Sequence, residues 1–249
     1  MRKISVFCWN IGNPSIDRAK KQAEYLLKRS EDFFILTEAK GSKGCLFLKN
    51  YFTANGYNVV MPDMSPREYG VMGLSKYSFK IGNFNENINF LPSRAISMIS
   101  NLPIGKIEII GLYIPSRNAN KNKIIRKKTF IRKISNALKH SSKNIRIVCG
   151  DFNILEPNHF PRYGFFKNWE YQFYNNLIDF NLIDAFRHLN PDVKEYSWVG
   201  RTGDGYRYDH IFISNNASSL VNKCFYDHSL RNAKLSDHSG IVAEIKIGI

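Results

Sequence analysis

The sequence predicts an α/β fold in which β-sheets pack face to face and helices cover their outer sides. Short apolar, β-prone runs outnumber the helical patterns, and these runs follow one another without a regular alternation with helices. No internal repeat, low-complexity tract or linker divides the chain. We therefore expect residues 1–249 to form one domain, a size that single α/β domains routinely reach.

The first half of the chain is expected to hold most of the strands. A helix at residues 16–28 is preceded by Ser15 as its cap, with Ala19, Ala23 and either Leu26 or Leu27 on its apolar side. Apolar, β-prone runs predict strands at residues 3–9, 32–38, 57–61, 70–75, 94–100 and 106–113.

The second half mixes helices with further strands. Residues 121–140 carry one apolar stripe, formed by Ile124, Ile131, Ile134 and Leu138, and basic residues fill much of the remaining surface. A second helix is expected at residues 168–180, with Tyr171, Ile178 and either Tyr174 or Asn175 inward. Further strands are predicted at residues 146–149 and 206–213, and a last strand follows the Asp237 loop.

Composition points to a folded protein with a polyanionic partner. Hydrophobic residues make up 43% of the chain and aromatic residues 14%, which excludes wholesale disorder. Lys and Arg number 36 against 21 Asp and Glu, so the formal net charge is +15 and the pI is about 9.6. Nucleic acid is the commonest partner of such a surplus, and a generally basic, soluble surface is the alternative.

The cysteines and the first residues indicate the cellular compartment in which the protein is expected. The four cysteines, Cys8, Cys45, Cys149 and Cys224, lack C-x-x-C spacing, which favours reduced core thiols over disulfides or a zinc site. The chain begins without an apolar leader, and no stretch of 18 apolar residues occurs in it. We expect a soluble, cytoplasmic monomer that does not bind membranes.

Six runs share one pattern, in which a polar residue stands at or near the end of a predicted strand. These residues are Asn10, Glu38, Tyr113, Asp151 with Asn153, Asp209, and Asp237 with His238. Several carboxylates gathered in one place repel one another, and a hard divalent cation with oxygen ligands neutralises them. The repetition at strand ends therefore predicts a shared site.

The stretch 146–153 carries the best-placed pair of these residues. An apolar run stops at Gly150, and Asp151 and Asn153 follow two residues apart, so strand alternation would point both side chains the same way. A carboxylate accepts a proton from water, and an amide donates to a phosphoryl oxygen without adding charge. An ordinary turn is the alternative interpretation, because Gly, Asp and Asn all favour turns.

Seven segments resemble, in order, the motifs of the endonuclease/exonuclease/phosphatase superfamily, over nearly the whole chain. These segments are residues 9–12, 36–40, 70–76, 113–115, 150–153, 206–209 and 236–238. The run 182–187, then 196–198, then 207–209 looks most like the exonuclease III and abasic-site endonuclease branch.

The resemblance implies a four-layered α/β-sandwich with two mixed β-sheets, helices outside and a metal-dependent phosphoesterase site at one edge. It places Glu38 on Mg²⁺ or Mn²⁺, with Asn10 beside it and Asp237 near the same or a second metal. It also implies that Asp151 orients or deprotonates the attacking water, and that Asn153 and Tyr113 hold the phosphate. His238 would donate to the developing charge and pair with Asp209.

The leading hypothesis is a divalent-metal-dependent DNA nuclease of the exonuclease III kind. The surplus of positive charge favours a polyanion over a small phosphoester, because each phosphate contact adds to binding. The expected substrate contacts are Arg117, Lys127, Lys128, Arg132, Trp198 and Arg207. A phosphatase or an RNA-directed nuclease of the same superfamily is one alternative, and an inactive nucleic-acid-binding module is another.

Several features leave the substrate open. Thr37 stands where abasic-site endonucleases commonly carry Gln, and the loop between Trp198 and Arg207 is short. The resemblance therefore leaves abasic-site preference open, along with endo- against exonucleolytic cleavage, the number of metals and the biological pathway. The aromatic residues Phe160, Tyr163, Phe165 and Phe166 either stack on bases or pack in the core.

The other histidines are not expected to belong to the site. His210 follows Asp209 directly, but strand alternation should point its side chain to the opposite face, which argues against a catalytic role. The remaining histidines, His140, His159, His188 and His228, have no motif context.

Overall fold

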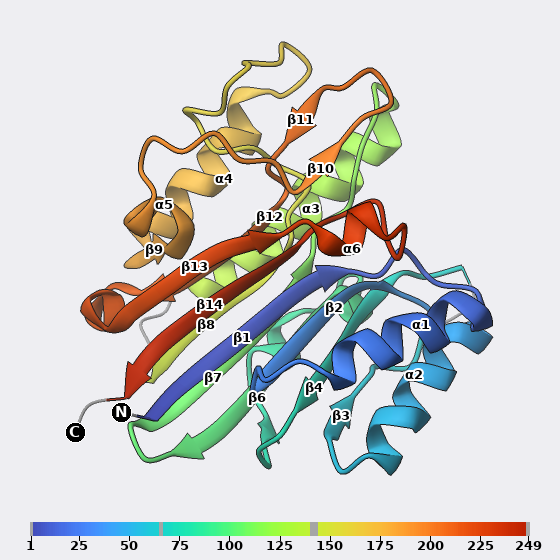
Figure 1. Cartoon of the computed structure of the whole chain (residues 1–249). Coiled ribbons are helices and arrows are strands. Elements are labelled where there is room, and N and C mark those ends of the chain that lie inside the picture. Colours follow the sequence, from blue (N-terminus) through green and yellow to red (C-terminus); the bar gives the residue numbers. More distant parts are fainter. Residues whose placement is uncertain (1, 65–66, 140–143, 248–249) are drawn as a thin grey trace.

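Two six-stranded β-sheets packed face to face form the centre of the molecule (Figure 1). The computed structural model describes residues 2–64, 67–139 and 144–247. The first sheet contains, in spatial order, β13 (Val221–Asp227), β14 (Gly240–Ile247), β1 (Arg2–Asn10), β2 (Phe33–Ala39), β4 (Gly70–Ser75) and β3 (Asn58–Val60). The second contains β5 (Lys80–Ile81), β6 (Ala95–Leu102), β7 (Gly105–Tyr113), β8 (Ile145–Asp151), β12 (Asp209–Ser214) and β9 (Leu182–Asp184).

Both sheets are mixed. Strands β1 and β2 are parallel, as are β7 and β8, and the other strand pairs are antiparallel. The inner faces bury one apolar cluster between the sheets, to which Val6, Ile35, Ile109, Ile147 and Ile241 contribute. Strands buried in this way read as continuous apolar runs, which is why the sequence predicts them.

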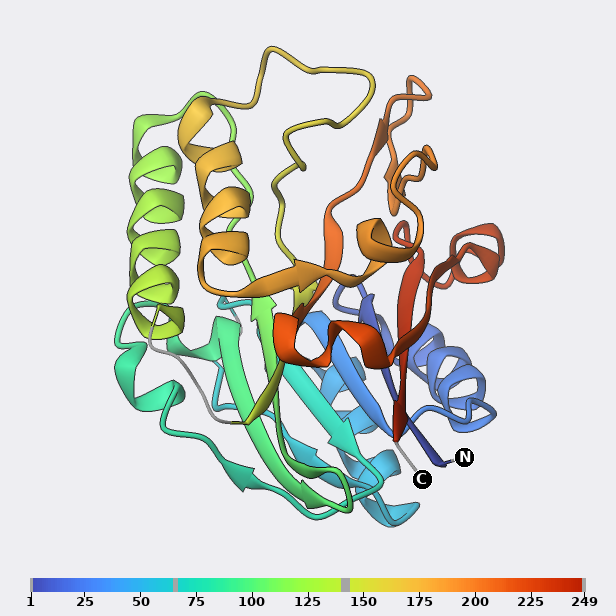
Figure 2. The same cartoon turned by 90° about the vertical axis from the view of Figure 1, so that its left-hand side faces the viewer.

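Helices cover the outer face of each sheet (Figures 1 and 2). Helices α1 (Ile16–Leu27) and α2 (Lys43–Ala54) pack on the first sheet, and α3 (Lys121–Leu138) and α4 (Asn168–Asp179) pack on the second. This arrangement is the expected four-layered α/β-sandwich. The shorter elements are α5 (Ala185–Leu189), α6 (Ser229–Asn232), β10 (Trp198–Val199), β11 (Gly205–Tyr206), and three 3-10 turns at Asn85–Asn87, Pro92–Arg94 and Asn215–Leu220.

The predicted helices are largely confirmed, with one error of orientation. Ser15 caps α1 through its hydroxyl, which accepts from the Arg18 amide, and Leu26, not Leu27, is the buried residue. Helix α3 is described to Leu138, and His140 lies outside the described residues. In α4 the predicted inward stripe is confirmed for Tyr174 and wrong for Tyr171 and Ile178. The buried residues are Glu170, Phe173, Tyr174 and Leu177, and Ile178 is exposed.

Helix α2 was not predicted. It carries a buried stripe of Cys45, Leu48 and Phe52, but Gly44 in its first turn lowers its helix propensity. That glycine is needed for packing, because a Cβ at this position would lie 2.0 Å from the Pro14 carbonyl oxygen. The close approach of α2 to the loop after β1 therefore outweighs local propensity.

Strand pairing brings the predicted polar residues to one edge of the sandwich. Asp151 ends β8 and is paired in register with Tyr113, which ends β7, and with Asp209, which begins the antiparallel β12. In the other sheet β1 and β2 end side by side, toward the upper right of Figure 1. Strand β1 ends on Asn10, and Glu38 lies at a bulge one residue before the end of β2. Strand ends from both sheets thus supply the site.

Two further expectations concern the whole chain. All four cysteines are free and buried, as predicted for core thiols. Among the described residues, no helix is long and apolar enough to cross a membrane.

Candidate active site

The polar strand ends open into a cleft of about 270 Å³ at this edge. Its lining consists of Glu38, Ser116, Arg117, Lys127, Asp151, Asn153, Phe165, Phe166, Trp198, Tyr208, Asp237 and His238. Three other predicted residues contact the lining from behind, because Asn10 bonds to Asp151, Tyr113 to Glu38, and Asp209 to His238. The predicted catalytic and metal-binding residues therefore come together.

Asp151 is buried and held by two donors. Its Oδ2 accepts from Asn10 Nδ2 at 2.9 Å, and its Oδ1 accepts from the backbone amide of Asn153 at 2.9 Å. Burial raises the pKa of Asp151 to about 7, and the neighbouring Asp209 carboxylate adds to this effect. A carboxylate with this pKa can accept a proton from water near neutral pH.

The route by which Asn153 reaches the cleft differs from the predicted strand alternation. Strand β8 ends at Asp151, and Asn153 has a left-handed backbone with φ 49°, a conformation that asparagine tolerates better than most residues. Its Nδ2 donates to the Ile114 carbonyl at 3.1 Å, which leaves the second N–H of the amide for a ligand. Gly150 lies inside β8, where a Cβ would meet the Leu112 carbonyl at 1.8 Å, so it serves strand packing.

His238 and Asp209 form a buried pair. His238 Nδ1 lies 2.7 Å from Asp209 Oδ2, and the second Asp209 oxygen is buried without a hydrogen-bond partner among the described residues. Burial alone would lower the pKa of His238, but the Asp209 carboxylate and the hydrogen bond to it raise the pKa to about 10. Since Nδ1 faces Asp209, the opposite ring nitrogen, Nε2, points away from this pair, and it lies 3.5 Å from Asn10 Nδ2.

Glu38 reaches the cleft from an irregularity in β2. The pairing of β2 with β4 shifts between Thr37 and Ala39, and Glu38 has a left-handed backbone with φ 57°. A bulge of this kind re-aims one side chain out of the strand pattern. The Tyr113 hydroxyl donates to Glu38 Oε1 at 2.6 Å, and burial together with the Glu38 charge raises the pKa of Tyr113.

A buried ion-pair group supports the opposite wall of the cleft. Lys127 Nζ lies 2.7 Å from Glu170 Oε1 and donates to the Asn153 carbonyl at 2.6 Å. Arg117 binds the same Glu170 carboxylate. Lys127 lines the cleft but is only 1% exposed, and its Nζ is already bonded to Glu170 and to the Asn153 carbonyl. These bonds hold Asn153 in place and argue against the predicted contact of Lys127 with a backbone phosphate.

Comparison with known proteins decides the family. The model of the endonuclease/exonuclease/phosphatase family matches residues 7–238. The chain belongs to this family. It is 27% identical over 205 residues to an exodeoxyribonuclease III of Haemophilus influenzae, a match that covers 72% of this chain and 77% of the relative.

Solved structures with the same fold are consistent with this membership. An AP endonuclease from Archaeoglobus fulgidus has a TM-score of 0.82 at 20% identity, covering 98% of this chain and 100% of that one. The 3′ phosphatase NExo from Neisseria, solved with a product DNA hairpin, has the same TM-score of 0.82 at 20% identity and the same coverage of 98% and 100%. These structures therefore support the fold, and the exodeoxyribonuclease III relative supports the branch that the motifs resemble.

The donors in this endonuclease/exonuclease/phosphatase site fit a divalent cation. The tightest group of possible metal ligands among the described residues is Asp151, Asp209 and His238, whose atoms lie within 4.8 Å of one another. We regard it as a poor metal site, because His238 Nδ1 is already bonded to Asp209 and its Nε2 lies 3.5 Å from Asn10 Nδ2. The carboxylates of Glu38 and Asp237, which line the same cleft, supply the oxygen donors that hard cations prefer.

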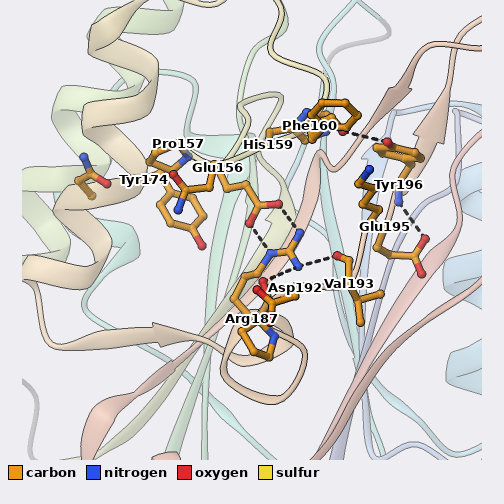
Figure 3. Close-up of a pocket in the computed structure, with 14 residues that line it drawn as sticks. Glu156, Pro157, His159, Phe160, Tyr174, Arg187, Asp192, Val193, Glu195 and Tyr196 are labelled. Carbon is orange, nitrogen blue, oxygen red and sulfur yellow. Dashed lines mark hydrogen bonds and ion pairs between the residues drawn. The ribbon is translucent and has the colours of Figure 1, made fainter.

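Arg207 is the clearest error among the predicted substrate contacts. It is fully buried, and its guanidinium binds Glu156 at 2.7 Å and Asp184 at 2.6 Å. Glu156 in turn binds Arg187 on one side of a separate cavity of about 580 Å³ (Figure 3). This part of the family motif therefore holds β9, α5 and β12 together behind the site.

The other predicted contacts are divided between the cleft and the surface. Trp198 lines the cleft and donates from Nε1 to Asp237 Oδ2 at 2.9 Å. Lys128 and Arg132 are exposed on the outer side of α3. His210 is buried next to Asp184, away from the cleft lining, as strand alternation predicted.

The aromatic residues after Asn153 are divided between the surface and the interior, and stacking of the exposed ones on bases stays a prediction. Phe165 is half exposed at the cleft and Phe166 is buried in its wall, whereas Phe160 is exposed at the separate cavity and Tyr163 stacks on Tyr206 with ring centroids 4.4 Å apart. Tyr208 and Glu170 were missed as site residues. Tyr208 could have been found from its place one residue before Asp209 in the motif.

Proposed function

We propose that this protein is a divalent-metal-dependent DNA nuclease that hydrolyses backbone phosphodiesters by in-line attack of water. The observation that carries the proposal is the buried Asp151 carboxylate, held by Asn10 and Asn153 and facing the same cleft as His238 and Glu38. The exodeoxyribonuclease III relative and the DNA complex of the 3′ phosphatase structure support DNA as the substrate.

Different side chains of the cleft act on the attacking water and on the phosphate. Asp151 orients the attacking water and accepts its proton, and the free N–H of the Asn153 amide contacts a phosphoryl oxygen. Asp209 fixes the ring of His238, so that Nε2 donates to the phosphate as negative charge develops. Pairing of an imidazole with a buried carboxylate in this way sets both its orientation and its charge.

Glu38 and Asp237, with Asn10 beside them, are the residues that would hold Mg²⁺ or Mn²⁺. When bound, the cation supplies Lewis-acid stabilisation of the phosphoryl and leaving oxygens. The Tyr113 hydroxyl keeps Glu38 turned toward the cleft through its hydrogen bond to Oε1.

The net charge of +15 favours a polynucleotide over a small phosphoester. A single phosphate is bound by the pocket alone, whereas a strand gains from every additional cation that it contacts through release of counterions. Exposed Lys128 and Arg132 on α3 are suited to such contacts. Since all the residues of the cleft come from one chain, we propose that the enzyme acts as a monomer, and its unpaired cysteines favour the reducing cytoplasm.

The decisive experiment compares substrates under matched conditions. Nicking of plasmid DNA, degradation of labelled duplex, single-stranded, abasic and RNA oligonucleotides, and release of inorganic phosphate from 3′-phosphorylated DNA are measured with Mg²⁺, with Mn²⁺ and with chelator. We expect metal-dependent cleavage of DNA that an Asp151→Ala, His238→Ala double variant lacks. Retained cleavage by that variant would overturn the site assignment, and phosphate release without strand cleavage would favour the phosphatase alternative.

A further inference from the structure

A histidine outside the cleft is bonded to the residue that follows His238. His228 stands between β13 and α6, and its Nδ1 lies 2.8 Å from Ser239 Oγ. Its other ring nitrogen, Nε2, lies 3.1 Å from Glu195 Oε1. The imidazole of His228 therefore joins the segment around Glu195 to the chain next to the catalytic histidine.

These three residues have the composition of a nucleophilic triad, in which a histidine lies between a serine and a carboxylate. Ser239 is 0% exposed, however, so its hydroxyl cannot meet a substrate. Neither Ser239 nor His228 is among the residues that line the cleft. The two hydrogen bonds of His228 therefore act on the position of the chain and take no part in covalent chemistry.

The segment that contains Glu195 is bound to Ser239 at a second point. The Ser239 amide donates to the Ser197 carbonyl at 2.8 Å. The Ser197 hydroxyl in turn accepts from the Asp209 amide at 3.0 Å. Ser197 thus links Ser239 to Asp209. With His228 in place, the segment 195–197 is held to Ser239 at both of its ends, and the hydrogen bonds form a closed ring.

The bonds at Ser239 are shorter than the direct bonds of the His238 backbone. The His238 amide lies 3.2 Å from the Ser236 hydroxyl oxygen, and the His238 carbonyl oxygen lies 3.2 Å from Trp9 Nε1. Both distances are at the long end of the range for N–H···O hydrogen bonds, whereas the two bonds of Ser239 measure 2.8 Å. Ser239 is therefore the firmer anchor of this part of the chain.

The contact between His238 and Asp209 is sensitive to this anchor. The two residues adjoin strands of different sheets, and a displacement of about 1 Å in a reacting group can cost about 100-fold in rate. We propose that His228 is a positioning residue, which holds Ser239 against the segment 195–197 and so keeps His238 in line with Asp209. The inference rests on the proposed function and adds to it a residue that does not touch the substrate.

Two amide substitutions separate the two bonds of His228. The side-chain amide of Asn lies near the position of Nδ1, and that of Gln lies near the position of Nε2. His228→Asn can therefore keep the bond to Ser239, whereas His228→Gln can keep only the bond to Glu195. We expect His228→Gln to lower kcat about 10-fold, with KM changed less than twofold because His228 does not line the cleft. His228→Asn should lower kcat less than threefold.

A proton resonance tests the geometry without any cleavage. The proton between His238 Nδ1 and Asp209 Oδ2, which lie 2.7 Å apart, should resonate far downfield, and its chemical shift reports the length of this hydrogen bond. We expect the resonance to keep its position in His228→Asn and to be displaced or lost in His228→Gln. Ser239→Ala removes the same bond as His228→Gln and should have the same effect. The two changes combined should be no worse than either alone, because both break one interaction.

His188→Gln is the matched control, because His188 is exposed on α5, and it should keep both kcat and the resonance. A merely structural role of His228 would lower the free energy of unfolding in urea and leave both readouts unchanged. An unshifted His238 resonance in His228→Gln would therefore overturn the positioning role, and so would equal losses in His228→Asn and His228→Gln. If the wild type cleaves no DNA, the proposed function fails, and the resonance still decides whether His228 positions His238.

Discussion

His238 Nδ1 lies 2.7 Å from Asp209 Oδ2, and the two residues adjoin strands of different sheets. Asp209 begins β12 in the second sheet, and His238 lies just before β14 in the first. The pair therefore joins the two sheets at the edge where the cleft opens. Its geometry depends on the packing of the sandwich as a whole, so the catalytic chemistry is coupled to the sheet-on-sheet fold.

Replacing Asp209 with Asn should impair catalysis with little effect on substrate binding. The substitution removes the charge that raises the pKa of His238, so the imidazole loses both its proton and its orientation. We expect kcat to fall about 10²- to 10⁴-fold, the range typical of lost acid–base catalysis, with KM nearly unchanged because Asp209 does not line the cleft. Single-turnover kinetics would measure this, and Asp204→Asn, on an exposed loop, is the control. A loss below threefold would contradict the assignment.

Replacing Glu38 with Gln should weaken metal binding directly. A carboxylate oxygen is lost from the proposed ligand set, so we expect Mn²⁺ affinity to fall at least about 10-fold in calorimetry without substrate. Tyr113→Phe removes only the 2.6 Å hydrogen bond to Glu38 and should give a smaller decrease in the same direction. Glu24→Gln, an exposed acid on α1, should bind the metal as the wild type does. Unchanged Mn²⁺ affinity in Glu38→Gln would remove Glu38 from the metal site.

Replacing Lys127 with Met should affect both stability and catalysis. Burial lowers the pKa of Lys127 to about 8, against the opposing effect of Glu170, so its charge depends on this ion pair. Met keeps the volume but leaves Arg117 as the remaining ion-pair partner of Glu170 among the described residues, and loss of one partner of a buried pair costs about 3 kcal/mol. Urea unfolding should show this loss. The kcat should also fall, because the Asn153 carbonyl loses its donor, and a variant with normal kcat would show that Lys127 is purely structural.

Replacing Lys128, the neighbour of Lys127, should affect DNA binding and leave stability nearly unchanged. Its side chain is exposed, so Lys128→Ala should change the unfolding free energy by less than about 0.5 kcal/mol. If it contacts a phosphate, the slope of log K against log salt for duplex DNA should become less steep by about 0.9, and Arg132→Ala should do the same. Slopes identical to the wild type would place the DNA away from the outer side of α3.

More of the candidate site than of the side-chain packing could be predicted from the sequence. Asn10, Tyr113 and Asp151 each end an apolar strand and Glu38 lies one residue before the end of another, so the local pattern alone indicates where they gather. The Glu38 bulge could not be foreseen, because a bulge depends on the register with β4 and leaves no local signal.

The errors concern residues whose state is decided by distant partners. Arg207 is a cation within a family motif, so the sequence suggests a substrate contact. Only the structure shows that it is buried and paired with Glu156 and Asp184. Lys127 lies on a basic helix face, yet Glu170, 43 residues later, draws it into the interior. The pattern of charges along the sequence cannot separate such buried cations from surface ones, because burial is decided by tertiary contacts with distant acidic residues.

The decrease in the free energy of unfolding at acidic pH should depend on the ion pairs of Glu156. Burial alone would raise the pKa of Glu156, but Arg187 and then Arg207 lower it to about 2. Because the folded pKa is below the unfolded value, the stability that this pair contributes is present above about pH 4.5 and is lost as the pH falls toward 2.

In urea unfolding followed by tryptophan fluorescence, the wild type should lose about 2 kcal/mol more than Glu156→Gln between pH 5 and pH 3, because Gln does not titrate. Asp192→Asn is the matched control, since Asp192 is exposed at the same cavity and has no ion pair among the described residues. Its stability should show the wild-type pH dependence. Parallel curves for the wild type and Glu156→Gln would mean that Glu156 is not paired with Arg187 and Arg207 in solution.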